Sequence, residues 1–326
     1  MRDVQRYTVG SRCQRVIVTA PRLYSQKLCA KLINAGARPL VVPAVQIGEL
    51  EEPEMGQLRA RLQALLAAPP DRRPTHIAFT SRNGIFATLD QLAAVAGGVE
   101  AAVGWLRGSS IRLCALGADG EVLGGLGLNV HVSPKEASTL GLVKELVARG
   151  EAVGSRVLCP VPHVTGGLVE PPVVPRFLKA LTDAGAFPER LPAYLTTLGC
   201  GPGACGAERE ALQRGQVAAI AFSSTAEAQG LIQLMGGAEA FSEAVRAYRV
   251  VLAAHGPYTA DGAGAVTGLP VTVVSKNFAT FDGLIAALEE HFAAGTGAGA
   301  GAGAVPGAAA GVAAGAGTGA RAGTAA

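Results

Sequence analysis

The chain contains an internal duplication, which constrains its fold more than any other feature of the sequence. RVIVTAP at residues 15–21 resembles RVLCPVP at residues 156–162, and IAFTSRNGI from residue 77 resembles IAFSSTAEA from residue 220. The offset stays near about 140 residues, apart from a short insertion, HVTGGLVE, early in the second copy. A repeat of this length predicts duplicated domain-sized units rather than a solenoid of short repeats.

Each copy alternates short apolar runs with segments of helical periodicity. In the first copy the runs are VIVTA, HIAFT, IRLCAL and VHVSP, and none alternates apolar with polar residues. Such runs are typical of strands buried on both faces of a parallel sheet. Gly36, Gly127 and Gly185 lie where the intervening helices should end. The sequence therefore predicts two similar doubly wound α/β domains of the flavodoxin or Rossmann type.

Composition narrows the possible partners. Apolar residues make up 49% of the chain, enough to bury a large core, and the net charge is only +3. No run of Lys and Arg is present, so we expect no nucleic-acid partner. No apolar stretch reaches the roughly 18 residues of a membrane helix without a charge or a breaker, so we expect no membrane partner. Residues 1–14 are predicted to form an N-terminal extension, and the Gly/Ala-rich residues 293–326 a disordered tail.

The usual signatures of metal and cofactor sites are absent or weak. The six cysteines form no C-x-x-C and no zinc spacing with the histidines, which favours buried free thiols in a reducing compartment. GPGACG at residues 201–206 fits G-x-G-x-x-G, but the first copy has no equivalent, which favours an interdomain loop over a dinucleotide site. We therefore expect neither metal nor cofactor. His163 and His255 follow strands and remain open as residues that face a cleft or are structural.

The segments after the predicted strands are rich in hydroxyls and glycine. TSRNG in the first copy and FSSTAE in the second follow their strands directly. Ligands bind at the carboxyl ends of strands in such sheets, and helix N-termini favour anions. The same hydroxyls could instead only cap the next helices, and the two roles are compatible. Tyr194 belongs to the second copy alone, since Val45 is its counterpart, and this asymmetry leaves a functional and a structural role about equally favoured.

Several motifs, in their order and spacing, resemble those of the uroporphyrinogen-III synthase family. They are V-T-x-P near the start, AFTSRNGI, LPAYLT at residues 191–196, GPYTA at residues 256–260 and the closing pair PKEASTLGL and SKNFATFDGL. The resemblance covers about residues 15–292. EPPVVPRFLKAL and AAHGPYTA are most similar to a plant and green-algal branch of the family.

The resemblance implies a particular arrangement of the two domains. The chain leaves its first domain, builds the whole second domain and returns through a two-stranded linker. The linker strands would be PLVVPAVQI and PERLPAYLT. The first domain would then hold residues 15–38 and 194–292, and the second domain residues 39–193.

The resemblance also implies a reaction without a cofactor. The substrate would be hydroxymethylbilane, a linear tetrapyrrole with carboxylate side chains, which loses its terminal hydroxyl, inverts its last ring through a spiro intermediate and closes to uroporphyrinogen III. Tyr194 would supply the proton to the leaving hydroxyl. The expected substrate-binding residues are Thr19, Ser81, Arg82, Asn83, Ser223, Ser224, Thr225, Gly256, Tyr258 and Thr259. The implied protein is a monomer of the plastid stroma that serves heme and chlorophyll synthesis.

Two positions depart from the family pattern. Ala20 stands where the family usually has the arginine of T-R-P, and Gly120 stands where a threonine is usual. A catalytically impaired paralogue that binds tetrapyrroles therefore remains the alternative function. A ligand-binding protein of the periplasmic-receptor type is a third interpretation, and the missing signal-peptide pattern disfavours it.

Overall fold

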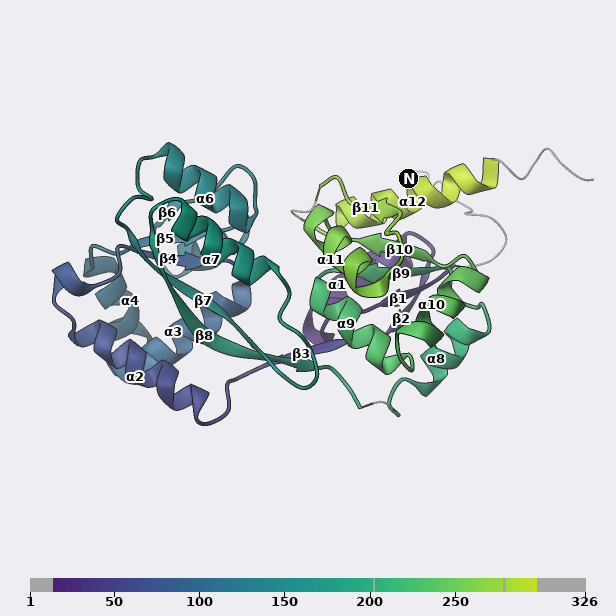
Figure 1. The fold of residues 1–326 in the computed structure, drawn as a ribbon, viewed down its shortest axis with the longest axis horizontal. Helices are drawn as coiled ribbons and strands as arrows, with labels where there is room; N and C mark the ends of the chain where they lie inside the picture. Colours follow the sequence, from purple (N-terminus) through teal and green to yellow (C-terminus); the bar gives the residue numbers. More distant parts are fainter. Residues whose placement is uncertain (1–13, 202, 278–279, 298–326) are drawn as a thin grey trace, which may run out of the picture.

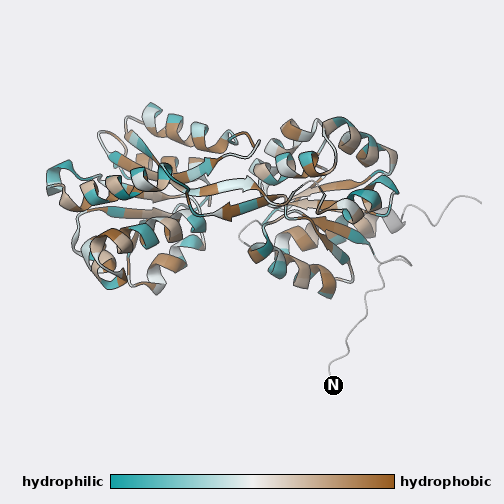
Figure 2. Cartoon of the chain, turned by 90° about the horizontal axis from the view of Figure 1, so that it is seen from below, coloured by the Kyte–Doolittle hydropathy of each residue, from teal (hydrophilic) through white to brown (hydrophobic). Residues whose placement is uncertain are grey.

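The computed structural model describes residues 14–201, 203–277 and 280–297. They form two α/β lobes that are joined by extended chain (Figure 1). This confirms the predicted fold class. Figure 2 shows the largely hydrophobic strands of each lobe between two layers of helices.

The first domain contains a five-stranded sheet of order β11-β10-β9-β1-β2 in which all strands are parallel. Helices α1 and α12 cover one face of this sheet, and α8 to α11 cover the other. The strands are β1 (Arg15–Val18), β2 (Arg38–Val41), β9 (Ala219–Phe222), β10 (Val251–Ala254) and β11 (Val273–Val274). The helices are α1 (Arg22–Asn34), α8 (Gly206–Gln213), α9 (Thr225–Leu234), α10 (Ala238–Ala247), α11 (Pro257–Thr267) and α12 (Asp282–Gly297).

The second domain contains a six-stranded sheet of order β3-β8-β7-β4-β5-β6. Helices α2 to α5 pack on one face and α6 and α7 on the other. The strands are β3 (Val45–Gly48), β4 (His76–Phe79), β5 (Arg112–Ala115), β6 (Val130–Val132), β7 (Arg156–Val164) and β8 (Phe187–Leu198). The helices are α2 (Glu54–Ala67), the 3₁₀ turn η1 (Pro70–Arg72), α3 (Arg82–Ala96), α4 (Val99–Gly108), α5 (Asp119–Gly125), α6 (Thr139–Ala148) and α7 (Val173–Asp183).

Each domain combines the start of one sequence copy with the remainder of the other. In the first domain β1 and β2 come from copy one and β9 to β11 from copy two. In the second domain β7 and β8 come from copy two and β4 to β6 from copy one. The orders β2-β1-β9-β10-β11 and β8-β7-β4-β5-β6 correspond strand by strand, and both are the flavodoxin-like order. The duplication therefore generates two equivalent sheets through exchanged halves.

Two chain segments cross between the domains at one place. β3 pairs antiparallel with the end of β8, with Val45 opposite Leu198. The backbones approach closely here, because a Cβ on Gly199 would lie 2.1 Å from the carbonyl oxygen of Pro43. Likewise, a Cβ on Gly230 of α9 would lie 2.1 Å from the carbonyl oxygen of Ala44. Glycine at these two positions lets both the return strand and α9 pack directly on the outgoing segment.

Sheet membership moves the predicted domain boundaries by a few residues. β2 pairs with β1 through Val41, so the first domain extends past residue 38. β8 stays paired with β7 through Thr196, so Tyr194 belongs to the second domain's sheet. The predicted linker strand at residues 39–47 is therefore divided, with its beginning in one sheet and its end in the other.

The predicted helix ends are confirmed, and one predicted boundary is wrong. Gly36, Gly127 and Gly185 follow α1, α5 and α7 with φ of 84°, 69° and 81°. Helix α12, however, continues to Gly297, so the tail predicted as disordered from residue 293 begins with helix. The rest of that tail and most of the predicted extension at residues 1–14 lie outside the described residues.

The helices are short relative to the thickness of a bilayer. No single helix in the described part of the chain is long and apolar enough to cross a membrane. The pair α3 and α4 reaches the necessary length and composition only together, with a bend of 101° between the two helices.

Candidate functional site

A cleft of about 360 Å³ lies between the two domains. It opens at the carboxyl ends of the strands where each sheet reverses its strand order, between β1 and β9 and between β7 and β4. These are the positions at which open α/β sheets bind ligands. The first domain contributes Pro21, Tyr24, Ser223, Ser224, Thr225, Ala226, Glu227, Tyr258 and Thr259, and the second domain and linker contribute Val45, Ile47, Asn83, Pro162, Val164, Pro171, Val173, Tyr194 and Thr196.

The walls of the cleft are apolar and hydroxyl-rich rather than cationic. Of the described residues that line it, none is Lys or Arg, and Glu227 is the only acidic one. Helices α9 and α11 begin at the cleft, as does α1 directly after Pro21. The first N–H groups of a helix have no intrahelical acceptor, and the macrodipole adds positive potential there. Carboxylates can therefore be bound by backbone N–H groups and hydroxyls.

Tyr194 lies on β8 with its side chain almost wholly buried at 7% exposure. Its phenol oxygen is 3.1 Å from Oγ of Ser81, the residue that caps α3 by accepting from the N–H of Gly84. Burial raises the pKa of Tyr194, and the hydrogen bond with Ser81 offsets this only in part. The phenol therefore keeps its proton at neutral pH and can act as a donor toward the cleft.

A second tyrosine reaches the same place from the other domain. The phenol of Tyr24 on α1 donates to Oδ1 of Asn83 at 2.5 Å, so this hydrogen bond joins the first domain to the second. Burial raises the pKa of Tyr24, against an opposing effect of Arg82. The sequence analysis did not select Tyr24. Tyr24 lies in the segment PRLYS, directly after the first apolar run, and this position was the signal in the sequence that could have pointed to it.

Glu227 organises the first-domain wall of the cleft. Its side chain is fully buried, accepts from the N–H of Ser223 at 2.8 Å, contacts Oγ of Ser223 and lies 2.6 Å from Oγ1 of Thr19. Ser224 caps α9 by accepting from the N–H of Glu227. The sequence S-x-x-E is the pattern of a capping box, in which the glutamate returns to the capping residue's own N–H. Here the carboxyl instead reaches Ser223 and the neighbouring strand.

The Thr19 hydroxyl has two acceptors within reach and one hydrogen to donate. The Thr19 hydroxyl lies 2.8 Å from the carbonyl oxygen of Ala221 as well as 2.6 Å from Glu227. A hydroxyl has one hydrogen, so when Thr19 donates to Ala221 the contact with Glu227 needs a hydrogen on the carboxyl. Burial raises the pKa of Glu227, and the hydrogen bonds that Ser223 and Thr19 donate to the ionised carboxylate oppose this shift.

Two further hydrogen bonds lie at the start of α11, beside the cleft. The phenol of Tyr258, at the start of α11, donates to Oε1 of Glu136 at 2.8 Å, and Glu136 precedes α6 in the second domain. The Thr259 hydroxyl donates to the carbonyl of Ser223 at 3.3 Å. Together with Tyr24 and Asn83, Tyr258 and Glu136 bridge the two domains around the cleft.

The structure brings most of the predicted binding residues together, with exceptions. Tyr194 and six of the other predicted residues line the cleft, namely Asn83, Ser223, Ser224, Thr225, Tyr258 and Thr259. Thr19 is completely buried, contacts Glu227 and does not line the cleft. Ser81 contacts Tyr194 behind the wall, Arg82 pairs with Asp119 at 3.5 Å, and Gly256 is the N-cap residue of α11.

The histidines and cysteines contribute little to the cleft. Across the described residues, no group of three or more His, Cys, Asp or Glu side chains is arranged to hold a metal ion. His163 lies 3.9 Å from Glu54 and does not line the cleft, and the ring of His255 packs on Phe281. Among the described cysteines all are free thiols, two of them only partly buried.

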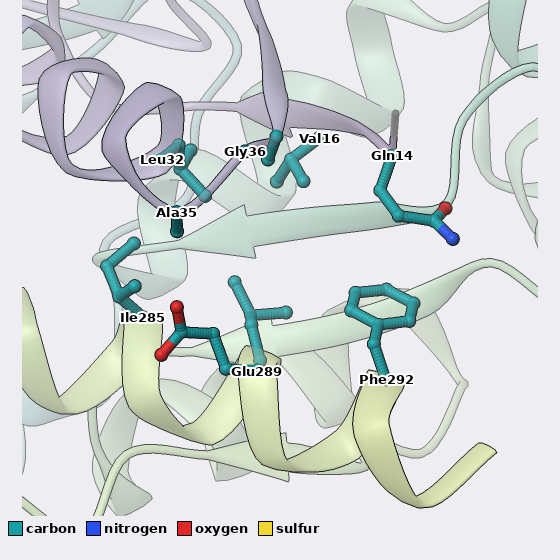
Figure 3. A pocket seen from close by; sticks show the side chains of 10 residues that line it. Gln14, Val16, Leu32, Ala35, Gly36, Ile285, Glu289 and Phe292 are labelled. Carbon is teal, nitrogen blue, oxygen red and sulfur yellow. The ribbon is translucent and has the colours of Figure 1, made fainter. Parts of the chain in front are cut away.

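A second pocket differs from the cleft in size and lining. It holds about 50 Å³ between α1 and α12, where Leu32, Ala35, Ile285 and Phe292 face one another and Glu289 lies at its rim (Figure 3). Its apolar side chains belong to the packing of these helices on the first sheet. We interpret it as a gap in helix packing, which is too small for a tetrapyrrole.

Comparisons with known proteins agree with this geometry. The family model described as "Uroporphyrinogen-III synthase HemD" matches residues 26–286. A mutant uroporphyrinogen III synthase from the extremely thermophilic bacterium Thermus thermophilus is 21% identical, covering 85% of this chain and 100% of that chain, with a TM-score of 0.55, and it supports the fold. The wild-type enzyme of the same bacterium in another crystal form is 21% identical, covering 86% and 99% of the two chains, with a TM-score of 0.41. None of the curated proteins compared with the chain matched it. Because the family model spans most of the chain, this protein belongs to the uroporphyrinogen-III synthase family.

Proposed function

We propose that the cleft between the two domains binds hydroxymethylbilane and cyclises it to uroporphyrinogen III. The family acts in tetrapyrrole biosynthesis as a cyclising lyase. The observation that carries the assignment to this cleft is the position of Tyr194, a protonated phenol that lines the cleft between the strand ends of both sheets.

The reaction needs a proton at the leaving hydroxyl, and Tyr194 is placed to give it. Its phenol is held by Ser81 on one side and lines the cleft on the other. When the hydroxyl leaves as water, the phenolate can be reprotonated by solvent or by the proton lost when the ring closes. Positioned proton donors typically contribute ~10²–10⁴-fold to a rate.

The same cleft suits a substrate with many carboxylates. N–H groups at the starts of α9 and α11, together with the hydroxyl of Ser224, offer donors without a fixed positive charge. The chain supplies no lysine or arginine among the described lining residues, so the intermediate's cationic character is not opposed by a nearby fixed cation. This lining supports binding of carboxylates together with the cationic chemistry of ring closure.

The contacts across the cleft imply that the domains separate during turnover. Tyr24 with Asn83, and Tyr258 with Glu136, join the two domains at its rim. A linear tetrapyrrole must pass between these pairs to reach Tyr194, so we propose that both break on entry. The crossing of β3 and β8 is the connection about which the lobes can move.

We further propose that the protein is a monomer of the plastid stroma that serves chlorophyll as well as heme synthesis. This rests on the similarity of EPPVVPRFLKAL and AAHGPYTA to the plant and green-algal branch. A fluorescent fusion of the full-length protein in a green alga tests the compartment, and light scattering on the purified chain tests the oligomeric state.

The deciding experiment supplies hydroxymethylbilane and measures the ratio of isomer III to isomer I. Spontaneous closure gives isomer I, so an active synthase yields isomer III in excess. A paralogue that only binds tetrapyrroles would bind the substrate but leave the spontaneous ratio unchanged. The departures Ala20 and Gly120 make this comparison informative. Gly120 lies in α5, where a Cβ would meet Val130 and Ala115, and it is not among the residues that line the cleft.

A further inference from the structure

Two cysteines lie in contact beside the crossing between the domains. Sγ of Cys200 is 3.0 Å from Sγ of Cys205, and both side chains are free thiols. Cys200 follows the end of β8, and Cys205 is the N-cap residue of α8. A disulfide has an S–S length of about 2.05 Å, so a shift of roughly 1 Å would join them.

The surroundings allow that shift. A Cβ on Gly201 or on Gly203 would meet nothing within 4 Å, so neither of these two residues is packed tightly against the rest of the protein. The N–H of Ala204 donates to the carbonyl of Gly201 at 2.9 Å, which already turns the chain back toward Cys205. This hydrogen bond keeps Ala204, and with it Cys205, close to Gly201 and Cys200.

The two thiols differ in accessibility and in charge environment. Cys205 packs in the first-domain core at 4% exposure, and burial raises the pKa of its thiol to about 12. The contact with Cys200 and, less strongly, the charge of Glu208 raise this pKa further, and Arg22 lowers it. Cys200 is only partly buried and donates to the carbonyl of Pro43 at 3.6 Å. An oxidant would therefore meet Cys200 first.

We propose that Cys200 and Cys205 form a reversible disulfide that fixes the return strand β8 to helix α8. The oxidant is a disulfide of low molecular weight or of a dithiol protein. The thiolate of Cys200 attacks one sulfur of that disulfide and expels the other as a thiolate, giving a mixed disulfide. The thiol of Cys205 then loses its proton and attacks Sγ of Cys200, which releases the second thiolate. Two electrons pass to the oxidant, and both protons end on its thiols.

The disulfide would lie next to the junction where the outgoing segment at Ala44 meets the return segment at Gly199. Gly199, directly before Cys200, donates its N–H to the carbonyl of Ala44 at 3.1 Å, and Ala44 donates to Thr19 at 3.0 Å. Tying Cys200 to α8 removes freedom from this junction, because α8 is packed into the core of the first domain. Oxidation therefore stiffens the connection between the domains.

Mass spectrometry of the full chain tests the bond directly. Cleavage after Arg190 and Arg209 places both cysteines in one peptide, residues 191–209. After treatment with oxidised glutathione, this peptide should lose the mass of two hydrogen atoms and resist alkylation, and dithiothreitol should restore both thiols. Recovery of two alkylated thiols after oxidation, or a bond to another cysteine, would overturn the proposal.

Single variants test the order of the steps. In Cys205→Ser, Cys200 should be trapped as a mixed disulfide with glutathione, because the second thiol is missing. In Cys200→Ser, Cys205 should remain unmodified because it is buried. Cys29→Ser is the matched control, since Cys29 packs on the opposite face of the same sheet, and it should leave the internal disulfide intact. Equal glutathione adducts in the first two variants would contradict the assignment of Cys200 as the entry thiol.

Hydrogen exchange tests the mechanical consequence separately from any activity. The amides of Gly199 and Ala44 should exchange roughly tenfold more slowly in the oxidised chain than in the reduced chain. Amides of β4 and β5 in the second domain serve as an internal reference and should not change. Unchanged exchange at Gly199 and Ala44 in a fully oxidised sample would show that the bond does not stiffen the junction.

Discussion

The hydroxyl of Ser81 lies 3.1 Å from the phenol oxygen of Tyr194, across the carboxyl end of β7. Ser81 follows β4 and Tyr194 lies on β8, and β7 separates these two strands in the sheet. The same serine caps α3 through the N–H of Gly84. The start of a helix therefore fixes the orientation of the phenol that faces the cleft.

The first prediction concerns the proton donor. Tyr194→Phe should lower turnover by about 10²-fold, the lower end for a positioned acid, because water in the cleft can replace part of its action. The fold should persist, since the ring remains buried. Steady-state kinetics with hydroxymethylbilane and the isomer ratio give the measurement.

Two variants complete this test. Ser81→Ala should slow turnover less than Tyr194→Phe, while losing about 1 kcal/mol of stability with the cap of α3. Thr259→Ala should weaken substrate binding more than it slows the chemical step. A Tyr194→Phe protein with the wild-type rate and isomer ratio but a lower Tm would mean that the phenol is only a structural hydrogen-bonding group.

The second prediction concerns the protonation of Glu227. Burial raises the pKa of this carboxyl above 4.5, so the unfolded state releases the proton at lower pH than the folded state. Wild-type stability should therefore fall as pH rises above 4.5 toward the folded-state pKa, and Glu227→Gln should remove that part of the dependence. Urea unfolding at several pH values measures it.

Glu227→Ala is the comparison that isolates the hydrogen bonds. It leaves the N–H of Ser223 without this acceptor, whereas the hydroxyl of Thr19 keeps the carbonyl of Ala221, and should cost about 1–3 kcal/mol for the unsatisfied N–H. A Glu227→Gln protein whose stability keeps the wild-type pH dependence above 4.5 would contradict the interpretation.

The third prediction concerns the contact between Tyr258 and Glu136. Hydrogen bonds from Ser138, Tyr258 and Lys144 hold the pKa of Glu136 at about 2, below its usual 4.5. A lowered carboxyl pKa stabilises the contact fully above 4.5, and this stabilisation disappears as pH falls toward 2. Tyr258→Phe should shift the domains toward open forms at neutral pH, seen as a larger radius of gyration in X-ray scattering.

A matched substitution shows whether the effect belongs to that contact. Tyr248→Phe changes an exposed tyrosine of the first domain that follows α10. It should leave the radius of gyration unchanged. Equal radii for wild type and Tyr258→Phe would mean that this hydrogen bond does not hold the domains together.

The fourth prediction concerns the packing of α9 on the crossing. Gly230→Ala places a Cβ 2.1 Å from the carbonyl oxygen of Ala44, so α9 must move and the protein should lose about 1–3 kcal/mol. Gly264→Ala in α11 is the control, because its Cβ would meet only an ordinary contact at 3.5 Å. Removing a helical glycine there should stabilise slightly. The Tm of each variant shows which effect on stability is larger, the clash of the new Cβ or the higher helix propensity of alanine.

The fifth prediction concerns His76 in the second domain. Burial lowers the pKa of His76 below 6.5, although Glu151 opposes the shift at 3.2 Å. The unfolded state then binds the proton more readily, so stability should fall as pH drops below 6.5. His76→Asn should flatten this dependence, whereas His131→Asn, at a partly exposed residue that contacts the same carboxylate, should change it less. A parallel slope for wild type and His76→Asn would exclude His76 as the source.

The sequence determined the elements and much of the site. Runs such as VIVTA and HIAFT form buried strands because nearly every side chain in them is apolar, and Gly36, Gly127 and Gly185 end helices because glycine adopts positive φ freely. The hydroxyls of Ser223, Ser224 and Thr259 follow their strands in sequence, so their position at the sheet edge follows from chain direction alone. The exchange of halves between domains was expected only through the family resemblance.

Only the tertiary structure decided which side chains meet. Glu227 fits the local pattern of a helix cap, yet its carboxyl bonds to Thr19, because β1 lies beside β9 in the folded sheet. Tyr24 and Asn83 are brought together by the way the two domains pack, and Cys200 meets Cys205 because α8 begins beside the end of β8. The periodicity of apolar residues predicts which face of a single helix or strand is buried. Contacts between elements depend on how the whole chain closes, and no short stretch of sequence carries that information.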